Sequence, residues 1–444
     1  MINRRRFVGS LAYGVCTAAS SRAAAPRIDG GVIRSQIEAL SVFGRLPGGT
    51  FQDGVSRVGY SDADIAGRKY VMDLMRRAGA SVRIDEAGDI FASRSGSDPS
   101  LKPVLFGSHI DSVPNGGNFD GDLGSLSAVA ILQLLHDLNT TTRRPLTAVV
   151  WACEEASFSG VALNGSRLAA GKAAPGELAV VSRGMAKAEA IRRIGGDPDH
   201  VERALIPKDS YHAYVELHIE QGGTRERDGV AAGVVDGIVS IDDYDVVVTG
   251  FANHAGTTPM AQRQDALVAA SMLTLAVRDI VTAESGAQVG TVGHIDVSPN
   301  ATNVIPGEVR LTVELRDLSS AKIARLGERV RARVAAIATE TRTTIEMKLA
   351  GHNETAGAAP EVQRVIEAAA SRLGLATKHL PSGAAHDAQM MATLMPMGMI
   401  FVPSVAGISH SPKELTHWQD CTNGANVLLE TVLAGVYWEV RCRR

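Results

Sequence analysis

The sequence predicts an α/β fold with a second domain, of β-α-β-β-α-β order, inserted into it. Two patterns predict this fold. Residues 103–155 alternate apolar, strand-like runs with a helix-like run, and residues 239–352 carry a separate series of strand and helix patterns. The chain has 444 residues, of which 45% are hydrophobic and 21% charged, and such a chain can build two domains with sizeable cores.

The first pattern surrounds the glycine-rich loop GSHIDSVPNGGNFDG. Residues 103–106 form an apolar, strand-like run before this loop, and residues 125–138 follow it with apolar side chains at helical spacing. A second apolar run, residues 146–152, leads to the acidic pair Glu154 and Glu155. Strand, helix and strand in this order predict a βαβ unit, whose functional groups gather beyond the carboxyl ends of the strands. The glycine-rich loop and the acidic pair each follow the carboxyl end of a predicted strand.

The second pattern is a complete split unit of the ferredoxin-like kind, β-α-β-β-α-β. Its elements are expected at residues 242–250 (strand), 263–281 (helix), 288–297 and 307–317 (strands), 320–340 (helix) and 343–351 (strand). We therefore expect residues 239–352 to form an inserted domain. The main domain would consist of residues 26–238 and of residues 353–444, which resume with a helix at residues 361–374.

Residues 1–25 have the features of an export signal. Three arginines, Arg4, Arg5 and Arg6, precede a short, weakly apolar stretch, which ends in small residues, Ala23 to Ala25. This order resembles a twin-arginine signal, so we expect export to the periplasm. A basic tail on a cytoplasmic protein is the alternative. The rest of the sequence has no apolar run long enough to span a membrane.

Composition and cysteine content narrow the possible partners. A net charge of −3 gives no electrostatic reason to expect nucleic acid. Four cysteines do not form a disulfide framework in a chain of this size, although Cys421 and Cys442 could pair in the periplasm. Cys153 follows an apolar run and precedes the acidic pair, and there we expect a small buried side chain rather than a nucleophile.

The glycine-rich loop and the acidic pair carry residues that suit a divalent metal ion. Imidazole and carboxylate groups on rigid elements bind Zn, Mn, Co or Ni. If residues 109–111 are extended, His109 and Asp111 point to opposite sides, so Asp111 suits a partner for the second imidazole nitrogen better than a ligand. Asp120 can fold back across the loop. Of Glu154 and Glu155, one can bind metal while the other acts as a general base.

Four more histidines, His218, His254, His386 and His410, follow in polar segments. A single histidine in a loop is usually a surface or capping residue, and adjacent glutamates are usually solvated. The run before the acidic pair has the character of a buried strand, however, and solvated carboxylates do not fit there. The number of such clusters at the ends of apolar elements favours a metal site.

Seven segments carry these residues in a fixed order: GSHIDSVPNGGNFDG, CEEASFSGVALNGS, ELHIEQG, NHAGTTPM, NATNVIPGEVRLTVELRD, SGAAHDAQMMA and FVPSVAGISHSPKE. Together they resemble the M20 metallopeptidase superfamily and, more narrowly, its hydantoinase/carbamoylase branch of amidohydrolases. The resemblance extends from about residue 34 to about residue 437. The branch includes N-carbamoyl-L-amino acid hydrolases, allantoate amidohydrolases and ureidoglycolate amidohydrolases.

The resemblance implies a main domain with a mixed sheet, helices on both faces and a site for two divalent ions. The inserted domain would serve as lid and dimerisation domain. His109 and His218 would hold one ion, Glu155 and His410 would hold the other, and Asp120 would bridge them.

The same resemblance assigns the remaining site residues. Glu154 would be the general base and acid, and Asp111 would orient His109. The substrate contacts would be Gln221, His254, Asn303 and Arg316. Arg316 suits a bidentate contact with a substrate carboxylate. His254 would reach the site of the partner subunit in a homodimer.

The activity implied is hydrolysis of the ureido C–N bond of an N-carbamoyl-L-amino acid, which releases ammonia and carbon dioxide. Allantoate and ureidoglycolate are alternative substrates. Two less similar functions are also alternatives. One is a dipeptidase or N-acyl-amino acid deacylase, and the other is a non-catalytic ligand-binding protein with the same fold. Histidine at position 218 favours the amidohydrolase branch, because peptidase branches often have a carboxylate there.

Three segments depart from the pattern of the branch. Phe158 stands where relatives commonly have arginine, and Ala385 stands where they usually have glycine. The ELHIEQG motif is followed by residues 223–225, Gly-Thr-Arg, instead of a turn that contains proline. No departure removes an implied metal ligand, and we expect the effect to fall on the size of the substrate.

Overall fold

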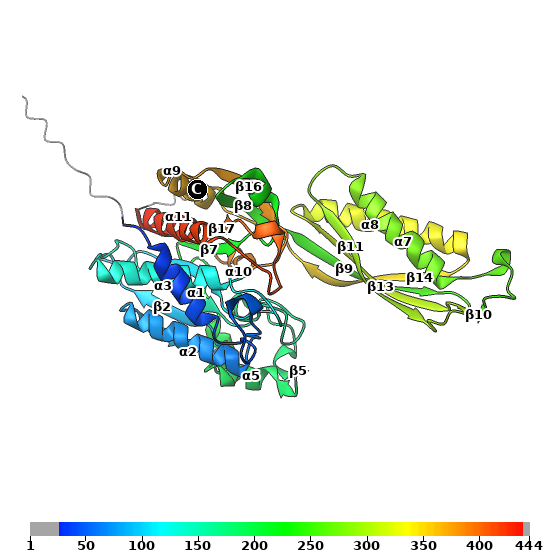
Figure 1. Ribbon diagram of the computed structural model, residues 1–444, viewed down its shortest axis with the longest axis horizontal. Coiled ribbons are helices and arrows are strands. Elements are labelled where there is room, and N and C mark those ends of the chain that lie inside the picture. The colour runs from blue at the N-terminus through cyan, green and yellow to red at the C-terminus, as the bar shows by residue number, and fades with distance from the viewer. Residues whose placement is uncertain (1–25, 438–444) are drawn as a thin grey trace, which may run out of the picture.

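The structure, a computed structural model, describes residues 26–437. Figure 1 shows a main domain, built from the N-terminal and C-terminal parts of the chain, and a small elongated domain built from its middle. The predicted export signal and Cys442 lie outside the described residues. Among the helices of residues 26–437, none has both the length and the apolar character that crossing a membrane requires.

The main domain is built on a nine-stranded sheet in the order β1-β2-β4-β3-β7-β17-β8-β15, with β16 also paired to β8. Its strands are β1 (Ser81–Ile84), β2 (Ile90–Arg94), β3 (Val104–His109), β4 (Leu146–Trp151), β7 (Ala213–Ile219), β8 (Ala232–Ile238), β15 (Ala356–Gly357), β16 (Thr377–Ser382) and β17 (Met397–Val402). β3, β4, β7 and β17 pair in parallel, whereas β2 is antiparallel to β4 and β8 is antiparallel to β17. The sheet is therefore mixed, as predicted.

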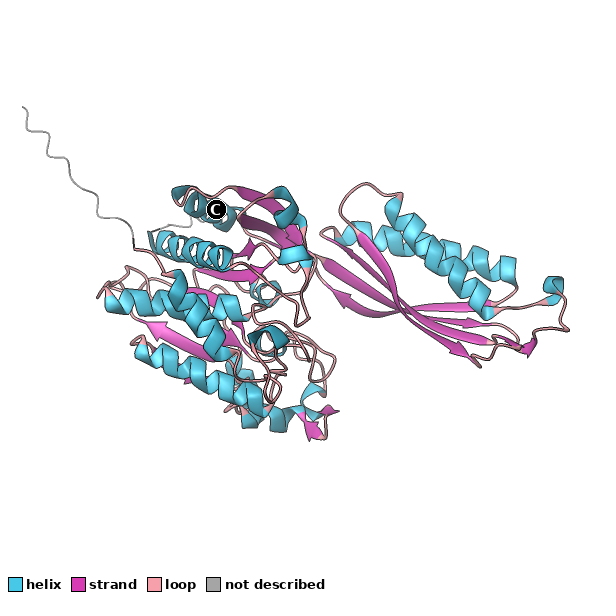
Figure 2. Ribbon diagram, in the orientation of Figure 1, coloured by secondary structure: helices cyan, strands magenta, loops and turns pink. Residues whose placement is uncertain are grey.

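Helices cover both faces of this sheet, which confirms the predicted fold class (Figure 2). One face packs against α1 (Gly30–Leu40), α2 (Asp62–Arg77), α3 (Asp122–Asp137), α9 (Pro360–Arg372) and α11 (Trp418–Tyr437). The other face packs against the short helices α4 (Asn164–Ala169) and α10 (Asp387–Met391). The connections contain α5 (Lys187–Arg193), α6 (Thr224–Asp228) and the hairpin of β5 (Val181–Ser182) and β6 (Met185–Ala186). β3 and β4 are buried at every residue because both of their faces are covered.

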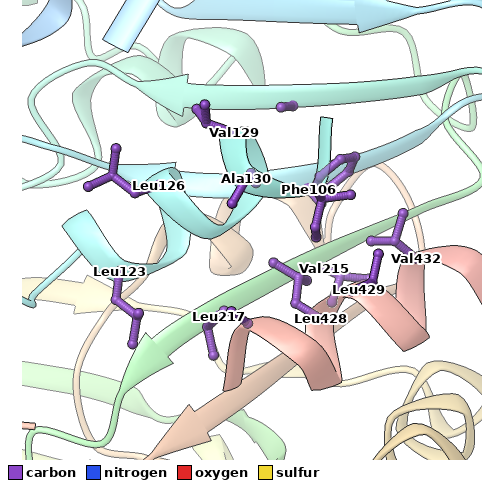
Figure 3. Close-up of a cluster of buried hydrophobic side chains, with 14 of the residues drawn as sticks. Phe106, Leu123, Leu126, Val129, Ala130, Val215, Leu217, Leu428, Leu429 and Val432 are labelled. Atoms are coloured by element: carbon purple, nitrogen blue, oxygen red, sulfur yellow. The ribbon is translucent and has the colours of Figure 1, made fainter. Parts of the chain in front are cut away.

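The larger hydrophobic cluster fixes α3 against the sheet (Figure 3). Leu126 and Val129 of α3 are buried in one cluster with Phe106 of β3, Leu217 of β7 and Leu428 of α11. Burying such a side chain stabilises the folded state by about 1.5–3 kcal/mol relative to leaving it exposed. The packing holds the first turn of α3, and with it the end of the glycine-rich loop, close to the ends of the strands.

The small domain (residues 240–353) is a four-stranded antiparallel sheet in the order β11-β13-β9-β14. Along the chain its elements are β9 (Ser240–Thr249), α7 (Ala266–Thr282), β11 (Val289–Ser298), β13 (Glu308–Asp317), α8 (Ser320–Thr341) and β14 (Thr344–Asn353). Both helices begin at a side-chain cap, Asp265 for α7 and Ser319 for α8. They cover the same face of the sheet, and the order is the β-α-β-β-α-β order expected from the sequence (Figure 1).

The small domain joins the main domain at one end only, its base. Residue 239 links β8 to β9, and residues 354–355 link β14 to β15, which pairs with β8. At the opposite end β10 (Asn253–His254) pairs with β12 (Val304–Ile305), and Figure 1 shows β10 far from the main domain. We call these two strands and the residues next to them the tip. β9 has ten residues, so it spans about 33 Å between the base and the tip.

Candidate metal centre

The polar residues predicted to form a site meet at one edge of the main sheet. His109 is the last residue of β3, and Glu154 and Glu155 follow the end of β4. His218 lies near the end of β7, and His410 lies in the loop after β17. β3, β4, β7 and β17 are parallel neighbours, so their carboxyl ends open on the same edge, where ligand sites of α/β sheets form.

His109, His218 and Asp120 form the first group of possible ligands. Oδ1 of Asp120 lies 3.1 Å from Nε2 of His218 and 3.6 Å from Nε2 of His109. Nδ1 of His218 lies 2.9 Å from the main-chain oxygen of Ile219, which assigns the proton to Nδ1 and a lone pair to Nε2. Nε2 of His218 is buried and makes no hydrogen bond. A buried lone pair beside a carboxylate fits a bound cation.

Glu155 and His410 form the second group, together with the other oxygen of Asp120. Nε2 of His410 lies 3.4 Å from Oε1 of Glu155 and 3.5 Å from Oδ2 of Asp120. In each group the candidate ligand atoms lie within 4.8 Å of one another. One carboxylate, that of Asp120, therefore lies between two sets of nitrogen and oxygen donors of the kind that bind Zn, Mn, Co or Ni.

Asp111 connects the end of β3 to the end of β4. Its carboxylate accepts the main-chain N–H of Glu154 at 3.0 Å and that of Glu155 at 3.2 Å. Nδ1 of His109 lies 3.0 Å from the main-chain oxygen of Asp111 and 3.7 Å from its carboxylate. The main-chain oxygen of Asp111 is thus the nearer partner of His109, and the carboxylate positions the acidic pair.

The glycines of the loop allow His109 and Asp120 to converge. Gly121 has a φ of +66°, in the left-handed region, and a Cβ at this residue would lie 2.4 Å from Cε1 of His109. The imidazole therefore rests directly against the main chain that follows Asp120. Any larger residue at position 121 would displace the ring.

The carboxylates of this edge are buried, and their electrostatics favour a bound cation. Burial raises the pKa of Glu154 well above its ordinary value, and the negative charges of Glu155 and Asp111 add to this effect. Burial and the nearby Asp120 raise the pKa of Glu155 to about 7. A divalent ion would relieve the repulsion among the carboxylates.

The structure divides the four predicted substrate contacts between three places. Gln221 belongs to the metal centre, because its Nε2 donates to Oδ2 of Asp120 at 2.6 Å. Arg316 lies at the base of the small domain, where Nη1 donates to the main-chain oxygen of Gly383 at 2.6 Å. His254 and Asn303 lie at the tip, where both are exposed. A single chain therefore does not bring His254 and Asn303 to the metal centre.

Sequence reasoning missed two acidic residues of the centre, Glu216 and Glu414. Glu216 accepts the hydroxyl of Ser108 at 2.7 Å and the main-chain N–H of Ala388 at 3.0 Å. It lies two residues before His218 on a strand, so the two-residue period could have placed both on one face. Glu414 accepts the main-chain N–H of Asp120 at 3.1 Å. It follows a lysine in a polar segment, and no local pattern predicts its burial.

His386, for which the sequence predicts no definite role, also lies within the centre. Its ring centroid lies 4.4 Å from that of His218, and its Nε2 lies 2.9 Å from the hydroxyl oxygen of Ser382. Burial holds the pKa of His386 well below its ordinary value. The ring therefore supports His218 as a neutral packing partner.

Two residues next to the acidic pair are part of the core. The ring of Phe158 packs edge-on against Tyr60, with centroids 5.1 Å apart. Phe158 thus contributes an aromatic contact to the core beside the acidic pair. Cys153 is buried, and burial raises the pKa of its thiol well above the ordinary value. A thiol that resists ionisation is a poor nucleophile, in agreement with the packing role expected for Cys153.

The sequence of the chain matches the model of one known protein family. A family model, peptidase family M20/M25/M40, matches residues 105–434. The match covers well over half of the chain, and the chain therefore belongs to this family. The resemblance inferred from the seven motifs is confirmed, and with it the prediction of a hydrolase.

Individual relatives place the chain in one branch of that family. It is 36% identical to the N-carbamoyl-L-amino acid amidohydrolase of Geobacillus stearothermophilus over 406 residues, 91% of this chain and 98% of the relative. It is 35% identical to the ureidoglycolate hydrolase of Arabidopsis thaliana over 414 residues, 91% of this chain and 86% of the relative. The crystal structure of a hydantoinase/carbamoylase family amidase from Burkholderia multivorans matches with a TM-score of 0.86 at 33% identity, and covers 93% of this chain and 99% of that one. The narrower resemblance is therefore confirmed as well.

Gly121→Ala is expected to weaken metal binding by at least about tenfold, because the added methyl group displaces the imidazole of His109. Gly229→Ala is the matched control: Gly229 has the same φ of +66°, but a Cβ there meets nothing within 4 Å. Both variants carry the same backbone strain, and only the first disturbs a candidate ligand. Isothermal titration with Zn²⁺ measures the difference, and equal affinities in the two variants would contradict the role of Gly121.

Proposed function

We propose that the protein hydrolyses the ureido C–N bond of an N-carbamoyl-L-amino acid or a related ureido acid. The observation that carries this proposal is the carboxylate of Asp120, shared by two groups of ligands with Glu154 beside them. The names of the relatives support a ureido substrate. Water attacks the carbonyl carbon, the C–N bond breaks, ammonia leaves, and the remaining carbamate yields the amino acid and carbon dioxide.

We further propose two divalent ions per subunit, drawn from Zn, Mn, Co and Ni. His109 and His218 would hold one ion, Glu155 and His410 would hold the other, and Asp120 would contact both. When bound, such ions lower the pKa of water and polarise a carbonyl group.

Glu154 has the position and environment of the general base. Its side chain is buried, and its Oε2 lies 3.9 Å from Nε2 of His109, beside the first group of ligands. A carboxylate in this position can accept a proton from a neighbouring water molecule. It takes a proton from the attacking water and returns it to the departing nitrogen. Asp111 holds the main chain of Glu154 in place for both transfers.

The tip of the small domain would complete the site of a second subunit. The tip lies about 33 Å from the base along β9, and a rigid rotation about the base preserves that distance. The base lies next to the chain's own metal centre, because Arg316 contacts Gly383, three residues before His386. His254 therefore cannot reach that centre. Phe251 and Met260 next to it are 62% and 76% exposed, and a homodimer would bury them.

Glu154→Gln is expected to lower kcat by at least about a thousandfold, because the amide cannot take the proton from water. Metal stoichiometry should stay at the wild-type value, since Glu154 is not one of the proposed ligands. Ammonia release and metal analysis of the same preparation measure the two properties. Turnover close to that of the wild type would exclude Glu154 as the base.

The substrate class is tested with purified protein loaded in turn with Mn, Co, Ni or Zn. Ammonia release is measured from N-carbamoyl-L-amino acids, allantoate and ureidoglycolate, and amine release from dipeptides and N-acetyl-amino acids. We expect metal-dependent ammonia release from a ureido compound, at least about tenfold faster than cleavage of any peptide or acetyl compound. The reverse order would make the protein a dipeptidase or deacylase. Bound metal without any turnover would indicate a ligand-binding protein.

The role of the tip predicts complementation between two inactive variants. In a heterodimer of Glu154→Gln and His254→Ala, one site combines an intact Glu154 with the intact His254 of the partner subunit. Unfolding and refolding the two variants together should therefore restore about one quarter of the wild-type rate, from random pairing of subunits. Each variant refolded alone is the control. A mixture no more active than the two variants alone would place His254 in its own subunit's site or outside catalysis.

A further inference from the structure

Glu414 is a buried carboxylate that joins the two loops of the metal centre. It lies four residues after His410, and only 5% of its surface is exposed. Oε1 accepts the main-chain N–H of Phe119 at 2.9 Å and that of Asp120 at 3.1 Å. Oε2 accepts the hydroxyl of Ser409 at 2.7 Å. The side chain of Glu414 therefore binds both Asp120, which the two groups of ligands share, and Ser409, which precedes His410.

Ser409 completes this connection from the other side. Its hydroxyl oxygen lies 2.9 Å from Oδ2 of Asp120, the oxygen that faces His410. The single hydroxyl proton of Ser409 can go to Oε2 of Glu414 or to Oδ2 of Asp120, so Ser409 lies between the two carboxylates and bonds one of them at a time. Asp120 is thus held at its main-chain nitrogen by Glu414, and its carboxylate lies against Ser409. These contacts fix both the position and the rotation of the Asp120 side chain.

The local backbone shows how closely this connection is built. A Cβ on Gly117 would lie 2.1 Å from Oε1 of Glu414, so glycine at this position leaves the space that the carboxylate occupies. His410 has a φ of +54°, a conformation that residues other than glycine rarely adopt without support from their surroundings. The side chain of His410 is 50% exposed, whereas those of His109 and His218 lie buried on strands. His410 therefore depends most on its loop for its position.

We propose that Glu414 is a positioning residue that sets the geometry between Asp120 and His410. This inference rests on the proposed metal function. Without the carboxylate, the loop of Asp120 and the loop of His410 would lose their common anchor. The ion held by Glu155 and His410 would be affected first, because the other ion keeps two histidines on rigid strands.

Three variants separate this role from a general contribution to stability. Glu414→Ala removes all three hydrogen bonds. Glu414→Gln keeps them, because its amide oxygen can accept the two main-chain N–H groups and its amide nitrogen can donate to Ser409. Ser409→Ala removes the hydroxyl alone. The matched control is Glu430→Gln. Glu430 is a buried carboxylate on α11 that pairs with Arg27 and Arg372, and it lies outside both groups of ligands.

Zn²⁺ binding is measured by isothermal titration and by metal analysis after dialysis, with folding checked by circular dichroism. We expect Glu414→Ala to bind the second ion at least about tenfold more weakly than the wild type, and Glu414→Gln to bind both ions within about threefold of it. Ser409→Ala should weaken the second ion as well, and it carries the test if Glu414→Ala does not fold. Glu430→Gln should bind both ions as the wild type does.

Wild-type binding in folded Glu414→Ala would overturn the proposal, as would a loss in Glu414→Gln as large as that in Glu414→Ala. Undiminished affinity for the second ion in Ser409→Ala would overturn it too. Failure of the proposed function gives a different result. A wild-type protein that binds two ions and hydrolyses no ureido compound would contradict that function, while the effects of the three variants on metal binding would still be measured.

Discussion

The carboxylate of Asp120 is the point at which three separate segments of the chain meet. It lies between the histidines of β3 and β7 on one side and the loop of His410 on the other, and Gln221 donates to it as well. Apart from the contact with His109, which belongs to the same loop, these contacts join residues far apart in the sequence. They form because parallel pairing brings the carboxyl ends of β3, β7 and β17 to one edge, and because α3, which begins two residues after Asp120, packs into the core shown in Figure 3.

Concentrating carboxylates at a buried edge is unfavourable without positive charge. Glu154, Glu155 and Asp111 all lie near Asp120, and burial raises the pKa of each of these three. The main-chain N–H groups of Glu154 and Glu155 donate to the carboxylate of Asp111 and offset part of this charge. The remaining negative charge favours a bound cation, so the feature that makes this edge electrostatically costly also suits it to hold a metal ion.

The sequence predicts the parts of this centre that depend on local pattern. Periodicity gives the βαβ unit and the inserted β-α-β-β-α-β domain, and the ends of apolar runs single out His109, Asp120 and the acidic pair. Which histidines converge with them follows from the motifs of the family, because convergence depends on strand order and not on local sequence. Glu414 could not be predicted, since its burial depends on space left by Gly117, almost three hundred residues away in the chain. The separation of His254 from its own metal centre is likewise a property of the assembled domain.

At the base of the small domain, Arg316 contacts the segment that carries His386. Arg316 pairs with both oxygens of Glu314, at 2.7 and 2.9 Å, and donates a third hydrogen bond to Gly383. A guanidinium has five N–H donors, so two remain, the number that a bidentate contact with a carboxylate needs. Gly383 belongs to the segment that carries His386, whose ring packs against His218. A substrate carboxylate bound to Arg316 would therefore be linked, through Gly383 and His386, to the ring of His218, a candidate metal ligand. A movement of the small domain that breaks the contact between Arg316 and Gly383 would also free one more N–H donor of Arg316 for the substrate.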